Sequence, residues 1–183
     1  DIQLMRSLGF KNYRFSIAWP RILPEGRGKI NQPGLDFYNR LIDGLLEAGI
    51  QPLATLYHWD LPTALEGGWQ NRSTPDAFAE YTGIVARQFG DRVKMWFTIN
   101  EPWCASFLSY SIGEQAPGMT DHFKGILASH HVLLSHGMAV RELRKTVQEA
   151  QIGIVLNMSP VHNDPEAPVS QEGRPCCEMP LYD

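Results

Sequence analysis

The sequence predicts an α/β fold in which parallel β-strands alternate with α-helices. Two observations lead to this prediction. Short apolar or alternating segments, typical of strands, recur between longer segments with the apolar spacing of amphipathic helices. The longest linkers follow the strands and precede the helices, as at the ligand-binding end of a parallel sheet. Because 43% of the 183 residues are hydrophobic, the chain can form a buried core.

The first predicted strand covers 13–19 and follows the end of a helix over 2–9, which Gly9 terminates. Pro20 is expected to stop the strand, because proline has no backbone N–H to donate. Alternation separates the side chains into two faces, with Tyr13, Phe15, Ile17 and Trp19 on one and Arg14, Ser16 and Ala18 on the other.

A helix over 33–48 follows the first strand and ends at Gly49. Its apolar side contains Leu35, Ile42, Leu45 and Leu46. A strand over 52–58 follows and runs into His58-Trp59-Asp60.

Two more units complete the pattern. Thr74 is expected to cap a helix that has Pro75 at its first position and ends near Phe89. The predicted buried side of this helix contains Phe78, Tyr81, Val85 and Phe89. The remaining elements are a strand over 93–99 that ends at Asn100-Glu101-Pro102, a helix over 123–148 and a strand over 152–158.

Two architectures fit this alternation, a closed βα-barrel and an open doubly wound sheet. No Gly-x-Gly-x-x-Gly motif or phosphate-binding loop follows a strand, which argues against a nucleotide-binding open sheet. The prediction is therefore a TIM (β/α)8-type barrel, of which four units, about half, are present. We expect residues 1–163 to form this partial barrel and 164–183, rich in Pro and Glu, to be a flexible tail. The chain begins at Asp1 inside a predicted helix, so its start looks cut.

The composition excludes several classes of function. A net charge of −4 argues against a basic nucleic-acid surface, and no apolar run reaches the roughly 18 residues of a membrane span. Three cysteines are too few for a disulfide framework, which favours a reducing, cytoplasmic setting and an inert thiol at Cys104. His130, His131 and His136 lack the i, i+4 spacing of a helical metal pair. We predict no metal and no cofactor.

The strongest candidate for chemistry is Glu101, at the end of a strand walled by aromatic residues. Burial there raises a carboxyl pKa toward the range of a general acid. The alternative is a glutamate that only caps a loop N–H. His58 and Trp59 suit a polyol, because an indole stacks on a sugar face while imidazole binds a hydroxyl. A structural core histidine is the alternative there, and Asp60 is interpreted as a turn-capping or ion-pairing residue.

Two further residues have open interpretations. Arg14 would be buried if its face lined a barrel interior, and would then need an acidic partner. That partner is either Glu101 or a carboxylate that this chain lacks. Trp69, in Gly67-Gly68-Trp69, either lines a cleft or anchors a loop.

Four motifs together resemble glycoside hydrolase family 1, the β-glucosidases and their relatives, which are (β/α)8 barrels. The motifs are Tyr13-Arg-Phe-Ser-Ile-Ala-Trp-Pro-Arg-Ile22, Leu56-Tyr-His-Trp-Asp-Leu-Pro62, Gly67-Gly-Trp69 and Trp96-Phe-Thr-Ile-Asn-Glu-Pro102. The resemblance runs from about residue 2 to Val161. It implies that Glu101 is the general acid/base and that Asn100 holds the sugar 2-hydroxyl. It further implies that His58 and Trp59 line the glucose subsite, Arg14 positions the nucleophile and Asn157 lines the cleft.

The family's nucleophilic glutamate, in its Thr/Ser-Glu-Asn-Gly motif, is absent from this sequence. The resemblance thus implies retaining hydrolysis of terminal β-glucosides or cello-oligosaccharides, in cellulose degradation, with only one of the two required carboxylates matched. The alternative is a truncated half-barrel, weak or inactive, that only binds sugar or associates with itself through exposed sheet edges.

Overall fold

A computed structural model describes residues 1–158 of the chain and contains a four-stranded parallel sheet with the order β1-β2-β3-β4. The strands are β1 (Asn12–Ser16), β2 (Gln51–Tyr57), β3 (Met95–Asn100) and β4 (Gln151–Val155). All three neighbouring pairs are parallel. The predicted alternation of parallel strands and helices is confirmed. The predicted tail over 164–183 lies outside the described residues.

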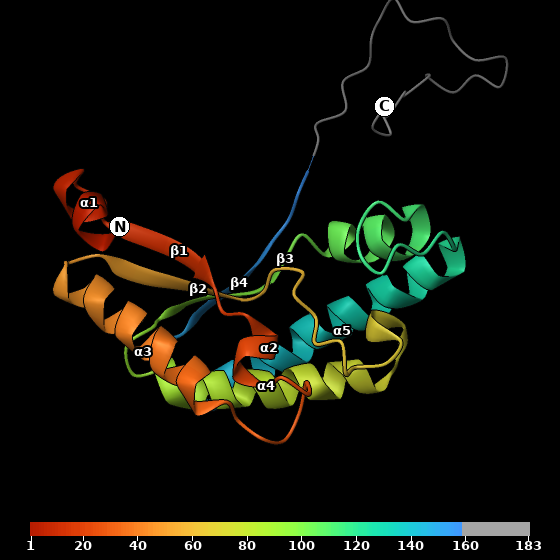
Figure 1. Cartoon of the computed structure of the whole chain (residues 1–183), viewed down its shortest axis with the longest axis horizontal. Helices are drawn as coiled ribbons and strands as arrows, with labels where there is room; N and C mark the ends of the chain where they lie inside the picture. The colour runs from red at the N-terminus through yellow and green to blue at the C-terminus, as the bar shows by residue number, and fades with distance from the viewer. Residues whose placement is uncertain (159–183) are drawn as a thin grey trace, which may run out of the picture.

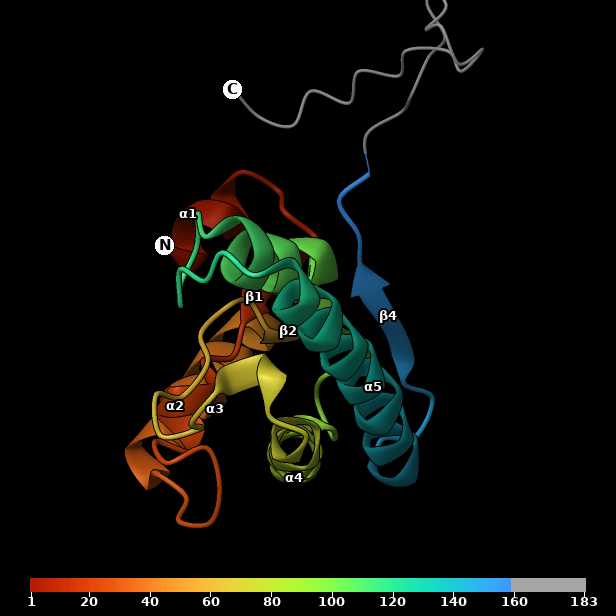
Figure 2. The same ribbon diagram turned by 90° about the vertical axis from the view of Figure 1, so that its right-hand side faces the viewer.

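The helices lie mainly on one side of this sheet. Figure 1 shows α3 (Gln32–Glu47) and α4 (Ser73–Phe89) beneath the strands, and Figure 2 shows α5 (His122–Thr146) beside β4. Shorter elements complete the fold: α1 (Ile2–Ser7), α2 (Trp19–Ile22), a 3-10 turn η1 (Gly68–Gln70) and a π-helix η2 (Cys104–Ile112). None of the helices among residues 1–158 is long and apolar enough to cross a membrane.

The core lies between the sheet and the helices. The predicted apolar side of α4 is confirmed, because Phe78, Tyr81, Val85 and Phe89 are all fully buried. The Tyr81 hydroxyl lies 2.8 Å from the carbonyl of Ile17 and 3.0 Å from that of Leu56, so it links α4 to the ends of two strands. Trp69 is 1% exposed and its indole N–H donates to the Tyr57 hydroxyl, which makes it a loop anchor.

Three local predictions are wrong, and one of them is the strand over 152–158, which ends at Val155. The strand predicted over 13–19 ends at Ser16, because Trp19 begins the short helix α2 with Pro20 in its first turn. Thr74 is not the N-cap of α4, which begins one residue earlier, at Ser73. Its buried hydroxyl instead donates to the Gly68 carbonyl at 2.6 Å and ties the helix to η1.

The opposite face of the sheet is open in the part of the chain that the structure describes. Arg14 and Ser16 of β1 are exposed, and Leu53 and Phe97 of the next strands are half-buried. By contrast, Trp96, whose side chain alternates with that of Phe97, is 1% exposed. In a complete barrel the open face would be the interior.

Candidate functional site

The carboxyl end of β3 holds its last residues in an unusual backbone conformation. Glu101 has φ 50°, in the left-handed region that residues other than glycine rarely adopt. Its N–H donates to the Val155 carbonyl at 2.8 Å, and its carbonyl accepts the N–H of Ala105 at 3.1 Å. The backbone of Glu101 is thus fixed on both sides, while its side chain is half-buried.

Arg14 binds the side-chain amide of Asn100, and not Glu101, which was one of the two acidic partners considered. Its guanidinium donates to Asn100 Oδ1 at 2.5 Å and lies 5.4 Å from the centre of the Phe97 ring. Of the two partners left open by the sequence, Glu101 is therefore not the one that Arg14 binds in the described residues. Arg14 is also exposed, because no described element covers this face of the sheet. A solvated guanidinium needs no buried counter-charge, so an amide oxygen suffices.

The segment after β2 brings an aromatic pair to the same place. His58 and Trp59 are both exposed, and their rings meet edge to face with centres 5.2 Å apart. Trp59 has φ 80°, and its indole N–H donates to the main-chain carbonyl of Asn100 at 2.9 Å. The end of β2 is thereby joined to the end of β3.

Asp60 is a turn-capping residue, as one of its two interpretations predicted. Its carboxylate accepts the backbone N–H of His58 at 3.4 Å. Burial raises the pKa of this carboxyl, and hydrogen bonds from backbone N–H groups, including that of Trp19, oppose the rise. Its polar atoms are thus engaged by the main chain.

Cys104 adds a group that the sequence prediction did not place at the site. It is 6% exposed and lies at the start of η2, three residues after Glu101. Burial raises the pKa of its thiol to about 11, with further contributions from a hydrogen bond and the charge of Glu101. A thiol with such a pKa is protonated near neutral pH, in agreement with the predicted inert thiol. In the sequence, the only indication of a contact between Cys104 and Glu101 was their separation of three residues.

The predicted site residues therefore fall into two groups. Arg14, Trp59, Asn100 and Glu101 form one connected cluster, with His58 packed against its indole. Asn157 is exposed two residues beyond β4, and no hydrogen bond found among residues 1–158 joins it to this cluster.

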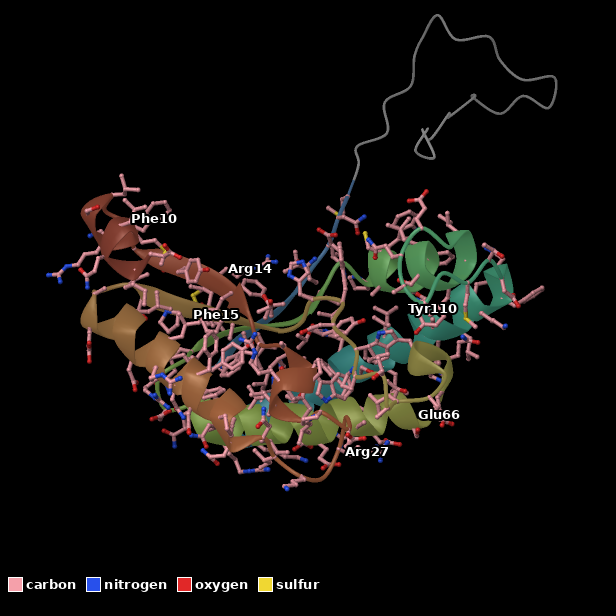
Figure 3. The ribbon with its side chains drawn as sticks, in the orientation of Figure 1. Phe10, Arg14, Phe15, Arg27, Glu66 and Tyr110 are labelled. Atoms are coloured by element: carbon pink, nitrogen blue, oxygen red, sulfur yellow. The ribbon has the colours of Figure 1, made fainter. Side chains whose placement is uncertain are left out.

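An open hollow of about 560 Å³ adjoins this cluster on the β1 side. Its lining includes Arg14, Ser16, Arg21, Tyr38 and His58. Figure 3 shows Arg14 above β1, on the side away from α3 and α4, whereas Glu66 lies near η1 on the helix side. Glu66, considered because a retaining mechanism needs a second carboxylate, is thus remote from Arg14.

Two histidines of α5, His131 and His136, make hydrogen bonds inside the fold, as predicted, whereas His130 is exposed. His131 Nδ1 lies 2.8 Å from the Trp69 carbonyl, and His136 Nδ1 lies 2.7 Å from the Thr98 hydroxyl. Burial lowers the pKa of His136. Across residues 1–158, no three His, Cys, Asp or Glu side chains are grouped so that they could hold a metal ion.

Comparison with known proteins gives consistent similarities. The family model described as "Glycosyl hydrolase family 1" matches residues 1–174. Beta-glucosidase A of Thermotoga maritima is 55% identical over 159 residues, and beta-glucosidase A of Acetivibrio thermocellus is 54% identical over 161 residues. These alignments cover 86% and 87% of this chain but 36% of each relative, so the chain spans just over a third of their length.

Solved structures show the same partial coverage. A family 1 β-glucosidase from Thermotoga maritima superposes with a TM-score of 0.89 at 51% identity, over 92% of this chain and 38% of the other. The complex of a Thermotoga maritima β-glucosidase with castanospermine gives a TM-score of 0.88 at 52% identity, over 90% and 38% of the two chains.

Proposed function

Because the chain belongs to glycosyl hydrolase family 1 and its sheet is a portion of that family's barrel, we propose that it carries the acid/base half of a retaining β-glucosidase. The observation that supports this most is the fixed end of β3. Glu101 and Asn100 are held there by β1, by β4 and by the segment after β2, with the Glu101 side chain half-buried. Such fixation is what a group that must meet one glycosidic oxygen requires.

In the proposed reaction, Glu101 protonates the leaving glycosidic oxygen and then, as a carboxylate, activates the water that releases the sugar. Asn100 would hold the 2-hydroxyl. Since Arg14 only donates hydrogen bonds, its partner on Asn100 must be Oδ1, and Nδ2 remains as the donor for a sugar hydroxyl. Arg14 would also position the nucleophile.

The proposed substrate is a terminal β-glucoside or cello-oligosaccharide, and the proposed context is cellulose degradation in the cytoplasm. His58 would bind a glucose hydroxyl, and the exposed face of Trp59 would contact the sugar ring. Asn157, beyond the end of β4, would line the cleft. Support comes from the two relatives named above, each of which is called beta-glucosidase A.

A retaining mechanism needs a second carboxylate about 5–5.5 Å from the first. The family's nucleophile motif is absent from this sequence. Asp60, whose carboxylate caps a turn, and Glu66, near η1, are poor substitutes. The open sheet face therefore favours a second candidate: a half-barrel, weak or inactive alone, that only binds sugar or pairs with another chain through the edges β1 and β4.

Hydrolysis of a chromogenic β-glucoside by the purified chain tests the first candidate, with Glu101→Gln as the matched control. The parent chain should hydrolyse the substrate faster than the Glu101→Gln control. Equal rates would contradict the proposal that this chain is catalytic. Light scattering tests association, because a strictly monomeric 20.7 kDa particle would contradict pairing through the edges.

A further inference from the structure

The indole of Trp59 makes a specific polar contact, in addition to the exposed ring face that is proposed to contact the sugar. Its N–H donates to the carbonyl of Asn100, 41 residues along the chain, at 2.9 Å. That carbonyl belongs to the peptide unit that joins Asn100 to Glu101. Rotation of this peptide would change ψ of Asn100 and φ of Glu101, and so would redirect the Glu101 side chain.

The two sides of this peptide have different partners: the Glu101 N–H donates to the Val155 carbonyl of β4 at 2.8 Å, whereas the Asn100 carbonyl accepts from the Trp59 indole. The register between β3 and β4 is irregular between Phe97 and Asn100, so the regular ladder is interrupted just before the site. Glu101 then adopts φ 50°, and Trp59 itself adopts φ 80°. Left-handed conformations of residues other than glycine persist only where the surroundings hold them, and the bond between these two segments connects both.

We propose that Trp59 is a positioning residue whose indole N–H, through the Asn100 carbonyl, fixes the Asn100–Glu101 peptide and thereby aims the Glu101 carboxyl. The proposal deepens the acid/base role proposed for Glu101 and rests on it. The contact with Asn100 uses the ring N–H and leaves 37% of the Trp59 surface exposed, so sugar contact and positioning are compatible. They are nevertheless separable, because only positioning needs the N–H.

Cys104 provides an internal reporter of where the Glu101 carboxyl lies. After burial, the hydrogen bond and the charge of Glu101 are the next causes of its thiol pKa of about 11. Because the two groups are already in contact, a carboxylate that moves away can only weaken this effect. The thiol pKa should then fall.

The experiment uses the full chain with Cys176→Ser and Cys177→Ser, which leaves Cys104 as the only one of the three cysteines. Ionisation of its thiol is followed by NMR of a 13C-labelled cysteine β-carbon, which requires no turnover. Glu101→Gln calibrates the full effect of losing the charge. Trp59→Phe removes the N–H, and 3-benzothienylalanine at position 59 removes it while keeping the size and shape of the indole.

Both changes at position 59 should lower the thiol pKa, in the direction and over most of the range seen with Glu101→Gln. A thiol pKa that stays at the parent value with the benzothienyl ring, while Glu101→Gln lowers it, would overturn the proposal. So would a Glu101→Gln chain with the parent pKa, because the carboxyl would then not contact the thiol. A lack of glucosidase turnover, by contrast, counts against the proposed function and leaves the thiol result unaffected.

Discussion

The two faces of the sheet differ in what holds them together. On the helix side, Trp19, Phe78 and Tyr81 are fully buried, and their rings pack with centres 5.2 to 5.9 Å apart. On the open side, Arg14 is exposed and Phe97 is half-buried, and polar bonds connect strand ends. Burial of apolar area therefore stabilises one face, while the other carries the candidate chemistry.

This division means that stability and the site can be perturbed separately. A side chain removed from the helix side leaves a cavity, because α4 and α5 close over it. A side chain removed from the open side leaves solvent in its place. The loss of unfolding free energy caused by a substitution should therefore depend more on which face of the sheet carries the side chain than on the residue type.

The largest effect is expected for Phe78→Ala. Loss of a fully buried phenyl ring should lower the free energy of unfolding by about 3–5 kcal/mol. Phe97→Ala on the open face is the matched control, and its half-buried ring should cost about 1 kcal/mol by area. Urea denaturation of both variants measures the difference. Equal losses would show that the open face is covered in solution.

A smaller effect is expected for Tyr81→Phe, which keeps the ring and removes the hydroxyl. Two buried carbonyls, of Ile17 and Leu56, would lose this partner, at a cost of about 1–3 kcal/mol. Tyr13→Phe, on a 36% exposed ring of the edge strand, should change the free energy of unfolding little. If both variants matched the parent in thermal unfolding, water would be replacing the Tyr81 hydroxyl.

The same division explains what could be predicted from the sequence. Phe78 and Tyr81 follow the period of one helix, so a local pattern was enough to place them in the core. Glu101 was a candidate because the end of its strand could be recognised from the sequence pattern. The contact between Trp59 and Asn100 was not predictable, because it joins segments 41 residues apart through a backbone conformation that tryptophan does not signal.

Arg14 shows the opposite failure, in which a correct position led to a wrong partner. Its place on the polar side of β1 was predicted, but an acidic partner was expected only if the guanidinium were buried. Because this face is open, that condition is not met, and Arg14 binds the Asn100 amide oxygen instead. In the first strand, alternation continues through Trp19 although pairing stops at Ser16, since the period of side chains does not reveal where a ladder ends.

Arg14→Gln tests how much a bond on the open face contributes to stability. The exposed guanidinium makes one bond to Asn100 and one ring contact, so its loss should cost below about 1 kcal/mol. Thermal unfolding measures this, with Arg72→Gln, which breaks an exposed ion pair at the start of α4, as the control. A loss as large as that of Phe78→Ala would mean that Arg14 is buried in solution, for example by a second chain.

The smallest effect concerns pH and His136, which joins α5 to β3 through the Thr98 hydroxyl. Burial lowers the pKa of this imidazole in the folded state, so the unfolded chain binds a proton first as the pH falls. The neutral imidazole therefore stabilises the fold above the unfolded pKa of about 6.5, and this contribution declines as the pH falls through the lowered folded pKa. Unfolding by urea at pH 7.5 and pH 5 should show a loss that is smaller in His136→Gln, which keeps a polar partner for Thr98. An equal loss of unfolding free energy in both chains would mean that groups other than His136 cause the pH dependence.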